Sequence, residues 1–505
     1  MPEKKSRSVT RAQLFPVVLC LVAAFKILFF SISLPFFPED EELHFDAIHK
    51  FATGYTRQKN LPGFDPASAE IIELYHSPEF LKVPDPGRPF LPLSWWCTPN
   101  REYVPQELND RIAAWLELKN VEINAPPVYY IIGAAWYKLG RLMGYSGLFL
   151  LNWLRGLDAI GFGLFVFFSW MFVRECYPEN RYLQIAVPIF LLVIPQDCFL
   201  FIIPNALCAT FVSLTLLLLA KLCKEPNRNI LFYLATGLVA SATALLAFGN
   251  FLVAIPLLLA AWWIVRVRTG PPRSLLTVKT AAMLAAAALP IGLWMLNNRL
   301  TLGDWSGSKS KQDYLTWTMK PVFELFDHPL FTWDGFSYFA TTLSRNFWRG
   351  EMSWGAAHRS AWIDPVYLWL SLIFFCVFVW YVTRTKVGDR TETFANVMSL
   401  AFVGCSVLFL VAISLPFDFG RCVYPSEARP YFNSGRLIIG MLLPFLIVFL
   451  RGLQIVCGWF SKRLDPLYIA IGFAALIFVT ETVLFFPILS SRFTLLSFIL
   501  GRSCV

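Results

Sequence analysis

The chain has 505 residues, of which 56% are hydrophobic and only 15% are charged, and its mean hydropathy is +0.55. Soluble globular proteins carry about 25% charged residues, so the composition excludes that class and predicts an all-α polytopic membrane protein. The net charge of +9 is expected in short cytoplasmic loops rather than in a nucleic-acid site, because no nucleic-acid motif or basic tail accompanies it.

Apolar stretches long enough to cross a bilayer recur along the chain, and we expect about eleven spans, within a range of 11 to 13. The predicted spans are residues 13–37, 156–172, 183–203, 206–222, 230–246, 251–265, 278–296, 365–382, 395–415, 437–450 and 466–489. The basic residues before the first span keep the amino terminus in the cytoplasm, and that span is too long for a signal-peptide core. Five short basic loops then all fall on the cytoplasmic side.

The same threading predicts one membrane domain, 1–505, with two large extracytoplasmic segments. The first, 38–155, contains helix-like patches at 40–53, 66–80 and 106–118, and an apolar stretch at 126–140 that is too short to span and is expected at the membrane surface. The second is 297–364. The eleven cysteines have no zinc or redox spacing.

Four consecutive acids, Glu39 to Glu42, follow the first span. Pro38 fits the first position of a helix that ends at Gly54, which would place Asp40 and His44 on one face and Glu41 about 100° around it. A partly desolvated carboxylate at a membrane edge can act as a general base, and His44 could hold it or bind a phosphate. The alternative is a solvated, well-capped helix start.

The run Pro38-x-Asp40-Glu41-x-x-His44-Phe45, followed by Ala47 and Gly54, resembles the first-loop signature of a family of bacterial membrane proteins related to the GT-C glycosyltransferases. Three later stretches are similar to segments of the same family. They are Asn124 to Tyr130 (an HPPLYY-like segment), Asn346 to Gly350 with Trp354 (FWGxFGW-like), and Ser434 to Arg436 (GRYLLP-like). The family's histidine is Ala125 here, its tyrosine is Leu437, and the expected second acid falls on Leu207.

This resemblance implies a GT-C-like fold and transfer of a sugar from a polyprenyl-phosphate lipid donor, with inversion, on the outer face of the inner (plasma) membrane. Asp40 matches the acid that deprotonates or positions the acceptor, and Glu41 lies beside it. The acceptor would be a glycan, a lipid or a protein. The sequence leaves open whether a divalent cation (Mg or Mn) binds, and Asp40 and Asp197 are the candidate ligands. Asp197 could equally be a hydrogen-bonded structural residue.

Donor phosphate and sugar also need binding groups. Candidate substrate-binding residues are His44, Tyr129, Trp348, Arg349, Arg429 and Arg436, with Arg345 and Arg421 as further cations. Arginine forks match phosphate oxygens, and Arg436 stands where a lipid headgroup would lie, at the start of a span. The alternatives are ordinary snorkelling for the arginines and interfacial anchoring for the tryptophans, including Trp95 and Trp96.

Two other functions remain open. A transporter or flippase of lipid-linked glycans should carry mid-span charges and inverted repeats, and the sequence shows few such charges and no repeat. A non-catalytic GT-C-like assembly subunit is the other alternative, because the second acid is missing.

Overall fold

A computed structural model describes residues 6–490, except 33, 35, 37–39, 56, 76–104, 267–272, 352–359, 385–389, 421, 423 and 461–464. Trp95, Trp96, Trp354, Arg421 and Pro38 therefore lie outside the described residues.

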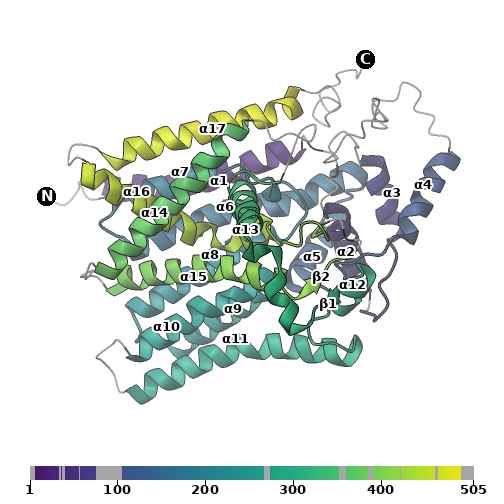
Figure 1. Ribbon diagram of the computed structural model, residues 1–505, viewed down its shortest axis with the longest axis horizontal. Coiled ribbons are helices and arrows are strands. Elements are labelled where there is room, and N and C mark those ends of the chain that lie inside the picture. The colour runs from purple at the N-terminus through teal and green to yellow at the C-terminus, as the bar shows by residue number, and fades with distance from the viewer. Residues whose placement is uncertain are drawn as a thin grey trace.

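The described chain is almost entirely helical, as predicted (Figure 1). Its α-helices are α1 Ser6–Ile32, α2 Glu41–Thr53, α3 Pro66–Tyr75, α4 Pro105–Glu117, α5 Val128–Leu142, α6 Gly147–Cys176, α7 Arg181–Val193, α8 Asn205–Lys224, α9 Ile230–Ala244, α10 Ala254–Arg266, α11 Arg273–Thr301, α12 Lys309–Tyr314, α13 Trp333–Arg349, α14 Asp364–Arg384, α15 Arg390–Ser414, α16 Leu442–Phe460 and α17 Pro466–Ser490. The short 3₁₀ helices are η3 Asp197–Phe199, η4 Phe248–Val253, η5 Val322–Asp327, η6 Pro329–Phe331, η7 Ala361–Ile363 and η8 Gly435–Met441. Two short strands, β1 Thr318–Met319 and β2 Phe417–Asp418, pair antiparallel.

Nine helices in the described part are long and apolar enough to cross a membrane, so the chain is a multi-pass membrane protein. They coincide with nine of the eleven predicted stretches, and the other two form α7 and α9, with 13 and 15 residues. An α7 of 13 residues rises only about 20 Å. The chain continues from α7 through buried irregular backbone around η3, which a membrane protein tolerates where protein surrounds it. The count of eleven spans stays a prediction.

Small residues bring the long helices close together, as is usual in membrane bundles. A Cβ at Gly163 of α6 would lie 2.8 Å from the Cys20 oxygen of α1, and one at Gly237 of α9 would lie 2.2 Å from the Met283 oxygen of α11. Glycine is therefore required at both crossings, and it fixes how α6 and α9 pack.

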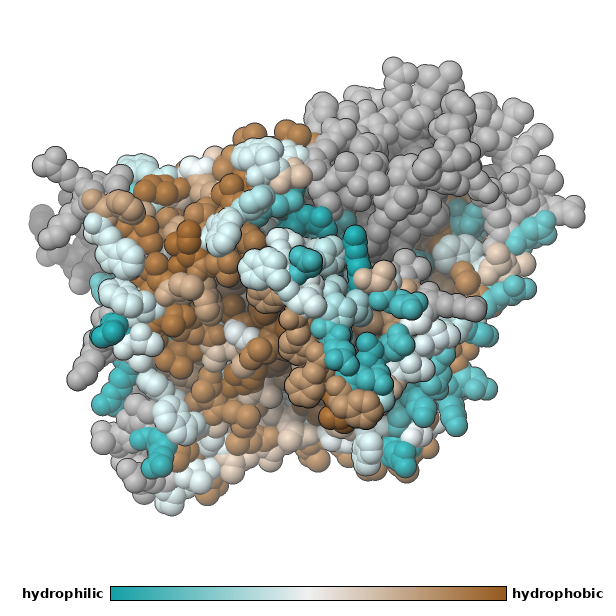
Figure 2. Space-filling view, in the orientation of Figure 1, coloured by the Kyte–Doolittle hydropathy of each residue, from teal (hydrophilic) through white to brown (hydrophobic). Residues whose placement is uncertain are grey.

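The polar elements gather at one end of the bundle. Figure 1 shows α2, α3, α5, α12 and the two strands at the right of the long helices, and Figure 2 shows hydrophobic surface over the helices with hydrophilic residues toward that right end. Hydrogen bonds such as Arg57 Nη1 to Asn298 Oδ1, 3.0 Å, join the first large polar segment to the second. The two predicted extracytoplasmic segments thus meet on one side of the molecule.

A second set of contacts joins the turns expected on the opposite side. Tyr177, after α6, donates to Asn396 Oδ1 at 2.7 Å, and Asn180 donates to Gln454 Oε1 at 3.0 Å. Both sets of contacts fit helices that alternate in direction, as the predicted threading requires.

The helix-like patches of the first segment form the predicted helices with small changes at their ends. α2 stops at Gly54, whose φ of 89° suits glycine, as the sequence indicated. α3 and α4 occupy the second and third patches, and α5 occupies the stretch expected at the membrane surface.

Candidate active site

The acidic run places its members in different surroundings because the backbone turns sharply at Asp40. Asp40 has φ 75°, a left-handed conformation that Asp tolerates better than most residues, and its carbonyl accepts from the His44 N–H at 3.1 Å. The helix begins at Glu41 rather than before Asp40. The expectation that Asp40 and His44 share a helical face is thus wrong in detail, since Asp40 lies just outside the helix.

Asp40 forms an ion pair with Arg436, which lies 396 positions later in the chain. Arg436 Nη2 is 2.7 Å from Asp40 Oδ2, and the side chains are 41% (Asp40) and 20% (Arg436) exposed. Gly435 makes this position reachable, because a Cβ there would lie 2.4 Å from the Phe347 Cα of α13. Two residues that the sequence analysis had nominated separately are therefore direct neighbours on an open surface.

A further acid borders the same arginine. Glu351 Oε2 lies 3.6 Å from Arg436 Nε, and Ser434 donates to the other oxygen of Glu351. The Glu351 N–H donates in turn to Asp197 Oδ2 at 2.8 Å. Asp197 is buried against Gly350, whose positive φ of 76° and lack of a Cβ leave room for the carboxylate. This position favours the structural alternative for Asp197, which orders the segment that holds Arg436.

A second pair of opposite charges lies on the other side of Asp40. Lys311 of α12 forms an ion pair with Glu122, from the loop before α5. Burial raises the pKa of the Asp40 carboxyl, but the positive charges of Arg436 and Lys311 outweigh it and hold the pKa below its usual value. The Glu122 pKa is likewise lowered, since Lys311 outweighs the effect of burial. Asp40 is therefore ionised at neutral pH, and the expectation that desolvation at the membrane edge raises its proton affinity is wrong, because the neighbouring cations outweigh the desolvation.

His44 lies beneath this charged surface. Its Nδ1 lies 2.8 Å from the Tyr130 hydroxyl, its ring stacks on Tyr130, and Tyr129 packs edge-on against it. Burial lowers the pKa of His44, more than the charges of Glu122 and Asp40 raise it. The imidazole is neutral at neutral pH, so it can exchange a hydrogen bond but supplies no fixed charge for a phosphate.

Glu42 is a site residue that the sequence analysis missed. One carboxyl oxygen is buried and has no hydrogen-bond partner within the described part of the chain. Burial, with the negative charges of Asp40 and Glu41, raises the Glu42 pKa to about 8. A protonated carboxyl thus stands two residues from an ionised one. The run of four acids was the available signal, but it does not show which member turns inward.

Glu41 does not lie at the open surface. Both of its oxygens accept from Arg155 of α6, at 2.8 Å each, and both side chains are 0% exposed. The Ile202 N–H donates to Glu41 as well, and Arg155 also binds the carbonyls of Ser31 and Leu34. The prediction that Glu41 is catalytic is therefore wrong, because its carboxylate is fully buried and is bound by Arg155 and by the Ile202 N–H.

Four of the predicted binding residues contact other side chains of the protein, and three of these four are buried. Trp348 is buried, stacks on Tyr367 with ring centroids 5.0 Å apart, and donates to Ser371. Arg349 is buried and bridges Asp364 and Glu481. Neither side chain is accessible to a sugar or phosphate, and both predictions are corrected.

The other two are Tyr129 and Arg429. Tyr129 is 0% exposed and lies behind His44, so it too cannot touch a ligand at the surface. Arg429 is exposed, donates to the Tyr338 hydroxyl at 2.7 Å and lies over that ring. No contact links it to Asp40 or Arg436 in the described residues.

The arrangement does not assemble a multidentate metal site from the described residues, where no group of three His, Cys, Asp or Glu side chains is close enough to hold an ion. The Asp197 carboxylate accepts from the Glu351 N–H and packs against Gly350, and the Asp40 carboxylate forms an ion pair with Arg436. Both candidate ligands are thus engaged with protein groups in this structure, and the divalent cation stays a prediction.

No family model and no curated protein sequence matches this chain at a significant level. It is similar to a crystal structure of the Archaeoglobus fulgidus oligosaccharyltransferase in complex with Zn and sulfate, with TM-score 0.38 and 13% identity, over 92% of this chain and 52% of the other. A second structure of that enzyme, tethered to an acceptor peptide, gives TM-score 0.36 and 14% identity, over 95% and 55%. The arabinosyltransferase EmbB from Mycobacterium smegmatis gives TM-score 0.42 and 13% identity, over 96% and 39%.

The chain thus spans about half of those proteins or less. Both are glycosyltransferases by name. At this level of likeness, the function of the present chain has to be argued from its own residues.

Proposed function

We propose that the protein is a membrane glycosyltransferase that moves a sugar from a polyprenyl-phosphate donor to an acceptor hydroxyl, with Asp40 as the general base. The observation that carries the proposal is the half-exposed Asp40–Arg436 pair at the polar end of a membrane bundle. A carboxylate to receive a proton and a guanidinium to offset a phosphate stand 2.7 Å apart. A carboxylate can accept the acceptor's proton and a guanidinium can bind the donor's phosphate.

The chemistry follows from the charges. As the acceptor oxygen forms its bond to the anomeric carbon, its proton passes to Asp40. The bond from that carbon to the phosphate oxygen breaks, and the phosphate leaves with the electron pair. Arg436 and Lys311 lie where they would offset the added negative charge. Attack opposite to the leaving group inverts the anomeric centre.

The backbone at Asp40 supports the same reading. Left-handed conformations at residues other than glycine cost energy and cluster at functional sites. Here the conformation turns the Asp40 side chain away from Glu41, which is committed to Arg155. It therefore separates a reactive carboxylate from a structural one within two adjacent residues.

A lipid donor also needs apolar surface near the site. Side chains before and at the start of α13 are strongly exposed, with Phe326 at 75% and Trp333 at 79%. From Trp333, α13 runs for about 21 Å to Phe347, where it packs against Gly435 of η8, the segment that carries Arg436. Exposed aromatic side chains of this kind suit a membrane interface, where the headgroup of a polyprenyl phosphate would lie.

The test is sugar transfer by protein reconstituted in liposomes with a labelled polyprenyl-phosphate sugar. Asp40→Asn should lower the transfer rate by about 100-fold or more, the usual contribution of a general base. Glu70→Gln removes an exposed acid from the same outer segment and should leave the rate unchanged. Wild-type rates in Asp40→Asn would overturn the proposal; lipid translocation without transfer in the wild type would favour the flippase alternative.

A further inference from the structure

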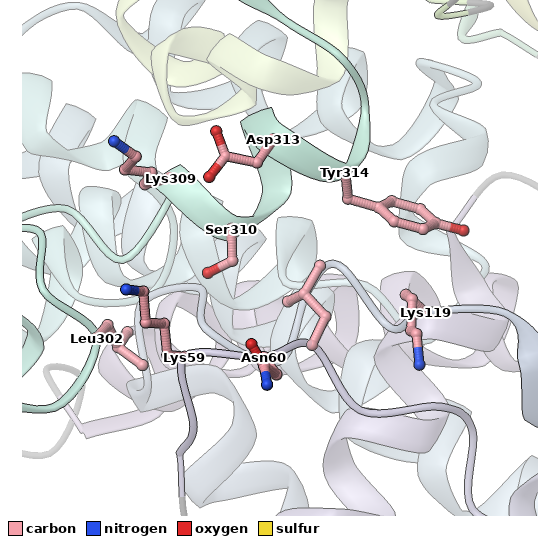
Figure 3. A pocket seen from close by; sticks show the side chains of 9 residues that line it. Lys59, Asn60, Lys119, Leu302, Lys309, Ser310, Asp313 and Tyr314 are labelled. Atoms are coloured by element: carbon pink, nitrogen blue, oxygen red, sulfur yellow. The ribbon is translucent and has the colours of Figure 1, made fainter.

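A cavity of about 470 Å³ lies between the two large polar segments. Figure 3 shows Lys309, Ser310, Asp313 and Tyr314 on one wall, all from α12, and Lys59, Asn60 and Lys119 on the facing wall, from the first segment. The cavity is therefore formed by parts of the chain that are far apart in the sequence, since Lys309 follows Lys119 by 190 positions and Lys59 by 250 positions.

The lining is basic. Three lysines, Lys59, Lys119 and Lys309, face one acid, Asp313. All three lysines are exposed, and none has an ion-pair partner among the residues that the structure describes. Ammonium groups of lysine are hydrated point charges that bind phosphate and carboxylate oxygens. An excess of positive charge in a concave site draws in anions.

The wall that carries Lys119 is held in place from below. Asn120 donates through its N–H to the Pro62 oxygen at 3.0 Å and through its side chain to Asp46 Oδ2 at 2.7 Å. Asp46 also binds Lys50, which donates to the Gly63 oxygen. A buried network thus fixes the backbone on either side of Lys119, so the cavity wall is pre-organised for a ligand.

α12 connects the cavity with the Asp40 centre. Its residue Lys311 pairs with Glu122 and acts on the charge of Asp40, whereas Lys309, Ser310 and Asp313 of the same short helix line the cavity. The cavity therefore lies directly behind the wall of the proposed active site. An acceptor whose anionic group is held in the cavity therefore has to reach Asp40 around α12, a helix of 6 residues that is about 9 Å long.

We propose that this cavity is an anion-binding subsite that holds a phosphate or carboxylate group of the sugar acceptor. The proposal deepens the proposed function and rests on it. Lys59 and Lys309, which lie at one end of the cavity in Figure 3, hold the oxyanion, whereas Lys119 and the exposed ring of Tyr314 lie at the other end and border the rest of the ligand. An acidic glycan and an anionic lipid headgroup would both supply this chemistry.

The experiment compares wild type with a variant that carries Lys59→Gln, Lys119→Gln and Lys309→Gln, which keeps most of each stem and removes the charges. Binding of glucose 1-phosphate, with glucose as the neutral probe, is measured by saturation-transfer NMR on detergent-purified protein. Wild type should bind glucose 1-phosphate and not glucose. The triple variant should bind it at least roughly tenfold more weakly, a loss of about 1.4 kcal/mol. Lys320→Gln, from the same side of the protein but outside the cavity, is the matched control and should bind as wild type does.

The second arm identifies the source of the oxyanion. Vesicles of phosphatidylglycerol or of phosphatidylcholine replace the sugar phosphate as the probe. The detergent-purified protein is diluted into each kind of vesicle, and the fraction that floats with the vesicles measures binding. A selective preference for phosphatidylglycerol that the triple variant loses assigns the site to a lipid headgroup. Loss of glucose 1-phosphate binding alone assigns it to an acidic glycan. Unchanged behaviour of the triple variant in both arms overturns the subsite.

Binding to Asp40→Asn separates this proposal from the proposed function. Asp40→Asn should retain glucose 1-phosphate binding even where transfer is lost. In transfer assays the triple variant should raise the KM for an acidic acceptor by roughly tenfold and change kcat by less than about twofold. Normal transfer by Asp40→Asn would remove the proposed reaction and leave the binding result standing, whereas full loss of transfer by Asp40→Asn with an unaltered triple variant would remove the subsite alone.

Discussion

Two neighbouring acids of one sequence run are used in opposite ways. Glu41 is 0% exposed and locked to Arg155, whereas the Asp40 side chain is 41% exposed and meets Arg436 at a surface. Both acids pair with an arginine at a contact of 2.8 or 2.7 Å. Contact distance therefore does not distinguish the buried ion pair from the pair at the proposed active site, but access to solvent does.

The largest expected effect lies on the buried side of this comparison. Glu41→Gln leaves the Arg155 charge buried without its counter-charge, and removal of one partner from a buried pair costs about 3–5 kcal/mol. Thermal unfolding of detergent-purified protein should show this loss of stability. Asp40→Asn, at a surface pair, should cost less than about 1 kcal/mol in the same assay.

The double variant Glu41→Leu with Arg155→Met sharpens the same comparison. It removes both charges together, and a buried pair replaced by apolar side chains is often nearly neutral in stability. We expect it to recover only part of the stability that Glu41→Gln loses, because the Ile202 N–H and the Ser31 and Leu34 carbonyls lose these partners as well. The coupling between the two substitutions, measured against Arg155→Met alone, should be nonzero, and purely additive effects would contradict the pair.

At the exposed surface, substitutions of Arg436 and of Arg429 should differ in their effect on the KM for the donor. Arg436→Gln should raise the KM for the polyprenyl-phosphate donor by roughly tenfold, because it removes a charge that faces the phosphate. Arg429→Gln is the matched control, since Arg429 contacts Tyr338 instead. Equal effects of the two substitutions on donor KM would contradict the assignment of Arg436.

The last prediction concerns pH and Glu42, the acid that follows Glu41 in the run. Its pKa in the folded protein is about 8, against an ordinary 4.5. The folded state thus favours the protonated form, so the contribution of Glu42 to stability is complete below about pH 4.5 and is lost as the pH rises through about 8. Glu42→Gln should flatten the fall in the unfolding temperature between about pH 4.5 and about pH 8. An identical fall in wild type and variant would contradict a raised pKa.

The sequence predicted the helices well because membrane spans depend on the length of apolar stretches, which a chain displays directly. The end of α2 at Gly54 and the helix at α5 followed from equally local signals. It also nominated Asp40 and Arg436, since charge at a membrane boundary is costly and stands out.

The partners of those residues could not be predicted in the same way. The left-handed turn at Asp40 decides which of four adjacent acids turns toward Arg436, and it depends on contacts made after folding. Burial of Trp348 and Arg349 depends on Tyr367, Asp364 and Glu481, which lie up to 132 positions away. The cavity behind α12 is formed by two distant segments, neither of which carries a recognisable motif.

The most direct test is the single-turnover rate of sugar transfer per folded molecule, measured side by side for Asp40→Asn and Glu41→Gln. Normalising to folded protein removes the loss of stability that Glu41→Gln causes. Our account predicts a rate at least about 100-fold lower for Asp40→Asn and a rate close to that of wild type for the folded fraction of Glu41→Gln. The reverse result, with transfer lost only when Glu41 is changed, would contradict it.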